Sequence, residues 1–380
     1  MEIPISLVLY FIIVVMVIYV TSIRIKIRVR TNSSFCKQIN QNDQQNKLSF
    51  LGIIIISLLF VLYNYCLTKM NPDMTHDRRV YSLFFHGYRS SPSLGLSFIS
   101  DLIHKFSSNV ETLFYVTTVI VMIITLLAYR TYKEASSSAL LFLLATQYVF
   151  FSYEALKQAY SNAFAFLCIA LIFRDEGKKD KVLSILAMVL AILFHHTGYF
   201  IIPLYLMLRI KKNKKTIIAI FTFIILLLIF FKPILLLVAN AINPIDSSLT
   251  AKILQYFGDT ATESLQTEGS LTVIKGIPFY ILTLVGLIKR NKLINKIENY
   301  DNHLFLSGML SFTYIATLYN GWVYRLSYYL LLSEGVFFTL LMKNTENSKN
   351  KVLLLLSTVG ITAIITIRFV ILMYVNYGGF

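Results

Sequence analysis

Polar and ionisable side chains interrupt the apolar runs of this chain at four places, and each could support chemistry. The first is the stretch FSYEALKQAYSNAF, which begins at residue 151. It carries polar residues at the spacing of one helical face: Glu154, Lys157, Gln158 and Ser161. Such residues are costly at membrane depth and usually indicate function, so we predict a substrate-binding face here. The alternative is a local Glu154–Lys157 ion pair at the membrane rim.

The second place is the sequence LFHHTGYF, in which His195 and His196 end an apolar run and Thr197 follows. A histidine can shuttle a proton near neutral pH, and it can also donate a hydrogen bond to a phosphate. A metal site usually needs a third ligand and an i, i+4 pair, so we predict no metal here. A structural histidine at the membrane interface is the alternative.

The third place is the sequence YNGWVYRLSYYLLLSE, in which Arg325 opens an apolar run and Tyr328 follows on the same helical face. The planar guanidinium of an arginine suits a phosphate, because it can form two parallel hydrogen bonds. Trp322 and Tyr324 could instead be aromatic anchors at the membrane surface. Glu334 lies roughly 13 Å deeper along a helix, where it needs a partner or water.

The fourth place is a loop between apolar runs, MNPDMTHDRRVYSLFFHGYR, which begins at residue 70. It gathers acidic, basic, imidazole and phenol groups: Asp73, His76, Asp77, Arg78, Arg79, Tyr81 and Arg89. This combination could hold a charged, hydroxylated ligand. An ordinary solvated loop is the alternative.

Apolar runs of transmembrane length must position these four places. The chain is 56% hydrophobic and only 14% charged. Most runs approach the ~20 residues that cross a ~30 Å hydrocarbon core, and none shows the alternation of a barrel. We predict an all-α, polytopic integral membrane helical bundle of about 12 transmembrane helices, with residues 1–380 as a single transmembrane domain. The runs cover residues 3–21, 49–67, 112–128, 135–151, 155–173, 182–197, 198–209, 216–239, 273–288, 304–319, 325–342 and 352–374.

Basic residues gather in every second gap between the runs. These gaps are 22–48, 129–134, 174–181, 210–215 with Arg209 at its edge, 289–303 and 343–351. By the positive-inside rule they face the cytoplasm, so both termini and the long loops 68–111 and 240–272 lie outside. The four polar places then lie on the outer side. The net charge of +16 is therefore a topology signal, and we expect no nucleic-acid partner.

The loops and motifs leave no place for a nucleotide. No gap could hold an ordinary nucleotide-binding domain, and neither a Walker A motif nor a GxGxxG turn is present. We therefore expect no cofactor, no ATP-driven pump and no nucleotide-activated donor. The cysteines, Cys36, Cys66 and Cys168, show neither metal-binding nor disulfide spacing. Residues 94–106 have the spacing of an amphipathic helix, which we expect at the outer interface.

Two pairs of residues in the first half of the chain match motifs of one family. Asp77 in the outer loop is followed by the aromatic Tyr81, and Lys157-Gln158 opens a middle helix. The family has Arg-Gln at the second position, so Lys157 keeps the charge but loses the fork geometry of arginine.

Two further elements continue the pattern in the same order. Phe194, His195 and Thr197 match a Phe-His-x-Ser/Thr element that ends the next helix, and Arg325 with Tyr328 matches a late Arg followed by Tyr. Over roughly residues 50–340 the chain thus resembles the EpsG-like and O-antigen polymerase (Wzy) group of bacterial polysaccharide polymerases.

The resemblance implies an enzyme of the bacterial cytoplasmic (inner) membrane with an active site that faces outward. Such proteins join oligosaccharide repeat units carried on undecaprenyl diphosphate into O-antigen, capsule or exopolysaccharide. Arg325 is then the expected diphosphate clamp, and Asp77 or His195 the expected base. The expected substrate-binding residues are Arg78, Arg79, Tyr81, Glu154, Lys157, Gln158, His196, Tyr324 and Tyr328.

Two other classes remain open. An O-antigen ligase-like transferase would use a similar polyprenyl-linked donor with a different acceptor. A lipid-linked oligosaccharide flippase or transporter would need polar groups at mid-membrane and internal symmetry, whereas the polar places here lie on one side. Expected partners are the undecaprenyl-diphosphate-linked glycan, membrane lipids and a chain-length regulator protein.

Overall fold

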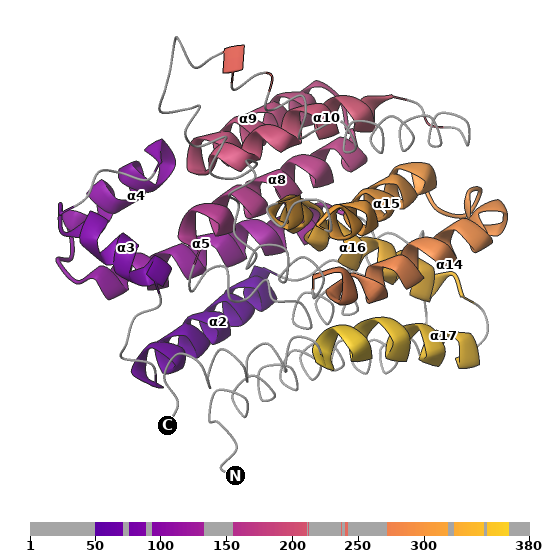
Figure 1. Cartoon of the computed structure of the whole chain (residues 1–380), viewed down its shortest axis with the longest axis horizontal. Coiled ribbons are helices and arrows are strands. Elements are labelled where there is room, and N and C mark those ends of the chain that lie inside the picture. Colours follow the sequence, from indigo (N-terminus) through magenta and orange to yellow (C-terminus); the bar gives the residue numbers. More distant parts are fainter. Residues whose placement is uncertain are drawn as a thin grey trace, which may run out of the picture. The chain divides into compact units, whose positions relative to one another are not determined.

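The computed structural model describes residues 50–70, 76–88, 93–132, 155–210, 212, 237, 240–241, 272–317, 323–345 and 348–364. Every regular element in these ranges is a helix (Figure 1). Three of the helices are long and apolar enough to cross a membrane: α5 (Val110–Thr131), α8 (Leu156–Arg174) and α16 (Tyr324–Lys343). The prediction of an all-helical fold with helices of membrane-spanning length is therefore confirmed for the described residues, whereas the number of about 12 transmembrane helices stays a prediction.

The helices follow most of the predicted apolar runs. The remaining elements are α2 (Phe50–Met70), α3 (His76–Phe85), α4 (Leu94–His104), α9 (Lys178–Phe194), η1 (His196–Phe200), α10 (Ile201–Arg209), α14 (Ile277–Leu293), α15 (Tyr300–Ala316), α17 (Ser348–Leu355) and η3 (Leu356–Gly360). The predicted runs 3–21 and 135–151 lie outside the described residues, as does 216–239 except for residue 237.

The chain divides into two compact units. We call them unit 1, residues 1–209 and 335–380, and unit 2, residues 210–334. The expectation of one transmembrane domain stays a prediction.

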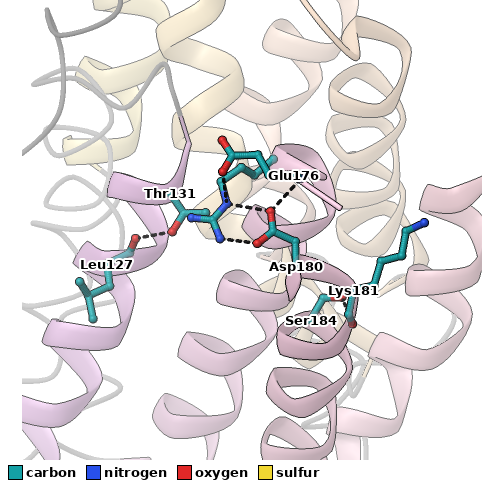
Figure 2. A network of polar contacts seen from close by, with 7 residues as sticks. Leu127, Thr131, Glu176, Asp180, Lys181 and Ser184 are labelled. Carbon is teal, nitrogen blue, oxygen red and sulfur yellow. Dashed lines mark hydrogen bonds and ion pairs between the residues drawn. The ribbon is translucent and has the colours of Figure 1, made fainter. Parts of the chain in front are cut away.

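An antiparallel helical hairpin, α8 followed by α9, is the centre of unit 1. Asp175 ends α8 in the left-handed conformation with φ of 38°, and Gly177 has φ of 104°, so the chain reverses in three residues. Asp180 lies in the first turn of α9, where the helix dipole stabilises a negative charge. Its carboxylate accepts hydrogen bonds from the Arg174 guanidinium and from the Glu176 backbone N–H (Figure 2). This polar network closes the hairpin at the end that carries the predicted cytoplasmic gap 174–181.

Small residues let the two helices of the hairpin approach closely. Ser184, Ala187 and Ala191 form a buried row along α9. Ser161 of α8 donates its hydroxyl to the Ala191 carbonyl oxygen at 2.7 Å, and this bond ties the helices together near the other end of the hairpin. As a result, the first turns of α8 lie beside the last turn of α9.

Helices α5 and α2 extend the hairpin into a bundle. Helix α8 packs between α9 and α5, and α5 packs in turn against α2 (Figure 1). The rings of Tyr129 and Phe166 meet edge-on, with centroids 4.7 Å apart, where α5 crosses α8. Asn64 of α2 donates to the hydroxyl of Thr118 on α5, which provides a buried polar contact between the two helices.

Helix α4 confirms the predicted amphipathic helix. Ser93 caps its start by accepting a hydrogen bond from the Leu96 N–H. One face is buried and packs against α5, α8 and α9. The opposite face is exposed and mixes apolar with charged side chains: Leu94 is 76% exposed and Phe98 is 69% exposed, and the exposed Asp101 lies beside them. Gly95 touches the end of α9, because a Cβ there would lie 2.8 Å from the Phe194 ring.

Unit 2 contains α14, α15 and the first half of α16. Arg290, near the end of α14, forms two hydrogen bonds of 2.8 and 2.7 Å with the Asp301 carboxylate at the start of α15. The Tyr300 hydroxyl also donates to the Gly286 carbonyl oxygen at 2.7 Å. These contacts close the turn between α14 and α15, which lies within the predicted cytoplasmic gap 289–303.

Candidate functional site

A buried hydrogen-bonded cluster joins three of the residues singled out in the sequence, and we call it the His195 cluster. Nδ1 of His195 lies 3.1 Å from the Thr197 backbone N and 2.6 Å from the Thr197 hydroxyl. That hydroxyl lies 3.5 Å from the Gln158 side-chain oxygen. The Gln158 amide in turn donates to the Asn162 side-chain oxygen at 2.8 Å. The cluster spans the end of the hairpin opposite to Arg174 and Asp180.

The polar row of α8 faces the protein interior. Gln158, Ser161 and Asn162 are buried, and Lys157 is half-buried. The row therefore extends into the bundle instead of remaining at a solvated rim. Glu154 lies outside the described residues, so its predicted role stays a prediction.

The backbone after α9 is shaped around His195. The helix ends there, because His195 is extended (φ −150°, ψ 133°) and its side chain caps the five-residue 3₁₀ helix η1. Gly198 donates its N–H to the His195 carbonyl oxygen at 2.8 Å. A Cβ at Gly198 would lie 2.6 Å from the Ala191 carbonyl oxygen, so only glycine fits this close approach.

Aromatic rings surround the imidazole and its neighbours. The ring of Phe194 stacks on Tyr160 with centroids 4.3 Å apart, and His196 stacks on His195 at 4.4 Å. His195 is 7% exposed, whereas His196 is exposed. Within the described residues, no three His, Cys, Asp or Glu side chains lie close enough together to hold a metal ion.

Helix α3 carries the described part of the polar outer-loop motif. Asp77 and Arg79 are exposed, whereas Tyr81 is buried and meets the Phe114 ring edge-on at 6.5 Å. Arg78 is 1% exposed, and its guanidinium lies 3.8 Å from the centre of the Phe114 ring.

Arg78 also forms an ion pair of 2.7 Å with Glu111 in the first turn of α5. The sequence reasoning missed Glu111, because nothing in the local pattern connects the two positions. The ion pair anchors α3 to α5, and the neighbouring Asp77 is exposed on α3. The predicted contact of Arg78 with substrate stays a prediction.

In unit 2, the predicted clamp residue lies in the first turn of α16. Arg325 is half-buried there. Tyr324 precedes it in the chain, and Tyr328 follows one helical turn later. The rings of Tyr324 and Tyr328 meet edge-on with centroids 5.4 Å apart. A cation in the first turn is disfavoured by the helix dipole, so helix stability does not explain an arginine at this position.

Glu334 has the polar partner that its depth requires. It is 1% exposed, and its carboxylate accepts a hydrogen bond of 2.7 Å from the Ser307 hydroxyl of α15. Thr283 of α14 lies 2.8 Å from both the Ser307 and the Ser311 hydroxyl oxygens. The sequence reasoning predicted the need for a partner but did not find these three hydroxyl groups, because single Ser and Thr residues are common in apolar helices.

Helices of spanning length with polar groups buried between them define a helical membrane protein. The chain belongs to the EpsG family, whose model matches residues 53–379. Membership indicates a polymerase-like, glycosyltransferase-like function in polysaccharide biosynthesis. The resemblance seen in the sequence is therefore confirmed. No curated protein and no solved structure matches the chain.

Proposed function

We propose that this chain polymerises undecaprenyl-diphosphate-linked oligosaccharide repeat units on the outer side of the bacterial inner membrane. The products would be O-antigen, capsule or exopolysaccharide. The His195 cluster carries the proposal, because it places a family motif at the end of the α8–α9 hairpin opposite to the basic turn 174–181. If that turn faces the cytoplasm, the cluster faces outward.

The reaction is a glycosyl transfer that needs no cofactor. A hydroxyl group of the acceptor sugar attacks the anomeric carbon of the donor chain. The bond between that carbon and the diphosphate oxygen breaks, and its electron pair leaves with undecaprenyl diphosphate. Cations stabilise the charge that develops on the leaving group, and a base takes the acceptor proton.

We assign these tasks to residues of the four sequence motifs. Arg325 binds the diphosphate, supported by Lys157 and Arg79, because each is a cation on a motif-bearing element. Arg78 acts through its ion pair with Glu111, which holds α3 in place. Asp77 or His195 takes the proton. The expected sugar-contacting residues are Tyr81, Glu154, Gln158, His196, Tyr324 and Tyr328.

The proposed topology follows the apolar runs. About 12 transmembrane helices form one domain, both termini lie outside, and the loops 68–111 and 240–272 face outward. The exposed Leu94 and Phe98 side chains of α4 then lie in the outer interface of the bilayer. A chain-length regulator protein is the expected protein partner, besides the membrane lipids.

A transporter of lipid-linked oligosaccharides is the second candidate, and one observation favours it. Glu334 with Ser307 and Thr283 is a buried polar network deep in the span α16, where transporters place substrate and ion sites. The family and the His195 cluster at one end of the hairpin favour the polymerase. An O-antigen ligase-like transferase would share that cluster, and it differs in the acceptor.

Deletion of the gene and analysis of surface glycan length distinguish these functions. Loss of the polymerase should leave glycans of one repeat unit on the carrier or on the final acceptor, and the wild-type gene should restore long chains. Complete absence of surface glycan would instead indicate loss of transport or ligation, and it would contradict the proposal.

A further inference from the structure

We propose that Glu334 of α16 is a buried binding site for one small monovalent cation, H⁺ or Na⁺. The site lies in unit 2 and uses none of the residues to which the proposed reaction assigns a task. It holds for the polymerase and for the transporter candidate alike. The evidence is the burial of the carboxyl group, the lack of a balancing charge, and a set of hydroxyl groups beside it.

The carboxyl group of Glu334 is buried in apolar surroundings on its own helix. The side chain is 1% exposed, and the charged residues of α16, Arg325 and Lys343, lie at the two ends of the helix. The neighbours of Glu334 one turn away are apolar and also buried: Leu330, Leu331, Phe337 and Phe338. An isolated ionised carboxylate is very costly to bury, so the group needs a cation or a proton.

One oxygen atom of this carboxyl group is available for such a ligand. Oε1 of Glu334 lies 2.7 Å from the Ser307 hydroxyl oxygen. Oε2 is buried and has no hydrogen-bond partner among the residues that the structure describes. Buried polar atoms of side chains usually have a partner, because an unsatisfied group costs free energy. Oε2 is therefore the atom that would carry the proton or contact Na⁺.

Three hydroxyl groups from two further helices complete a set of oxygen ligands. Ser307 and Ser311 lie one turn apart on α15, and Thr283 of α14 lies 2.8 Å from the hydroxyl oxygen of each. Oxygen atoms are the ligands that hard cations prefer. The same hydroxyl groups can also pass a proton, because each can both donate and accept a hydrogen bond. The cation would thus be held between α14, α15 and α16.

The described parts of α14 and α15 provide no ion-pair partner for Glu334. The titratable side chains one turn from the three hydroxyl groups are His303, Tyr314 and Tyr280, and none of them pairs with the carboxyl group. On this face of α14, the nearest charged side chain is Arg290, two turns from Thr283, and it pairs with Asp301. Neutralisation of Glu334 therefore depends on a small cation.

Infrared spectroscopy of the purified protein in lipid nanodiscs distinguishes the two cations. A protonated carboxyl group has a C=O stretching band that a carboxylate lacks, and the Glu334 band is the one missing from Glu334→Gln. After dialysis into a Na⁺-free choline buffer near neutral pH, we expect this band in the wild type. Its loss on addition of NaCl identifies a Na⁺ site that exchanges with H⁺, and its persistence identifies a site for H⁺ alone. Absence of the band in both buffers would overturn the proposal.

Removal of the Ser307 hydroxyl group tests whether it belongs to the site. The frequency of a carboxyl band depends on its hydrogen bonds, so Ser307→Ala should shift the Glu334 band. Ser333→Ala is the matched control and should leave the band unchanged, because the Ser333 hydroxyl donates to the Leu330 carbonyl oxygen of its own helix at 2.6 Å. An unshifted band in Ser307→Ala would contradict the set of hydroxyl ligands.

A chemical test on the wild-type protein does not depend on the folding of any variant. Dicyclohexylcarbodiimide is an apolar reagent that attacks protonated carboxyl groups. The carboxyl oxygen bonds to its central carbon, the carboxyl proton moves to one nitrogen, and the acyl group then migrates to the other nitrogen, which leaves a stable N-acylurea.

In the Na⁺-free buffer, mass spectrometry should find this adduct on Glu334 and not on Asp301, whose carboxylate is held by Arg290. Added NaCl should lower the yield on Glu334 if Na⁺ competes with H⁺, and it should leave the yield unchanged if the site takes H⁺ alone. Absence of the adduct from Glu334 in the Na⁺-free buffer would contradict the site.

Discussion

The Thr197 backbone N–H donates to Nδ1 of His195 at 3.1 Å, at the point where α9 gives way to the 3₁₀ helix η1. This contact makes the histidine part of a helix cap as well as part of a polar cluster. The cluster lies at one end of the α8–α9 hairpin, and the ion pair of Arg174 with Asp180 closes the other end. The hairpin therefore separates the candidate site from the basic turn 174–181, which the positive-inside rule predicts to face the cytoplasm.

The turn after α9 should tolerate no side chain at Gly198. Gly198→Ala would place a Cβ 2.6 Å from the Ala191 carbonyl oxygen, so the turn must open and the His195 ring must move. We expect loss of most polymer, measured as the length distribution of surface glycan. Gly360→Ala is the control, because no atom lies within 4 Å of the added Cβ. Full-length polymer from Gly198→Ala would show that the turn geometry is not needed.

Arg325 should be required for chain extension but not for folding. Removing a donor from a charge-stabilising site typically costs about 3 kcal/mol, so Arg325→Ala should slow extension by roughly 100-fold. Arg325→Lys should recover little, because a point charge lacks the planar fork. Lys343→Ala, at the other end of α16, serves as the control for loss of a positive charge. Normal polymer from the lysine variant would contradict a role for guanidinium geometry.

Arg78 should matter mainly for stability. Its guanidinium is buried between Glu111 and the Phe114 ring, and breaking a buried ion pair costs on the order of 3 kcal/mol. We therefore expect Arg78→Ala to lower the thermal midpoint in detergent, with a smaller further loss when Glu111→Gln is added. An Arg78→Ala protein of unchanged stability that fails to extend glycan would instead support the predicted contact of Arg78 with substrate.

Asp180 should stabilise the fold at neutral pH. The hydrogen bond from the Arg174 guanidinium is the main reason why the pKa of the Asp180 carboxyl lies below its ordinary value. A carboxyl with a lowered folded-state pKa contributes its full stability above the unfolded value of about 3.9, and the contribution disappears as pH falls through the folded-state pKa.

Asp180→Asn should accordingly lose about 1–3 kcal/mol at pH 7, and its deficit relative to wild type should shrink below about pH 4. Unfolding would be followed by thermal denaturation across this pH range. Asp175→Asn is the control, because the pair of Asp175 with Arg209 is exposed and should contribute under about 1 kcal/mol. A deficit in Asp180→Asn that persists unchanged at low pH would exclude ionisation as its cause.

The helices were predictable because their lengths are set by the bilayer. Apolar runs located α5, α8 and α16 to within a few residues. The ends of α9 were less predictable: the run 182–197 is shifted relative to Lys178–Phe194, because Asp180 supports an earlier start and His195 caps the next element. Charged residues and capping groups determine where helices end, and a pattern of apolar residues alone does not detect these groups.

The site was predictable only in part. The order of the motifs led to Gln158, His195 and Thr197, which the structure brings together. The partners of Arg78 and Glu334 could not be predicted, since Glu111 and Ser307 lie far from them in the sequence. Hydrogen bonds between helices depend on which helix faces pack together, and this packing is determined by the tertiary structure and not by the local sequence.

The most direct measurement is reconstitution of the purified protein in lipid vesicles with undecaprenyl-diphosphate-linked repeat units as the sole glycan substrate. We expect a ladder of longer lipid-linked chains and release of one undecaprenyl diphosphate for each bond formed, both lost in Arg325→Ala. Transfer of unextended repeat units across the bilayer, without a ladder and without release of the carrier, would contradict the account and identify a transporter.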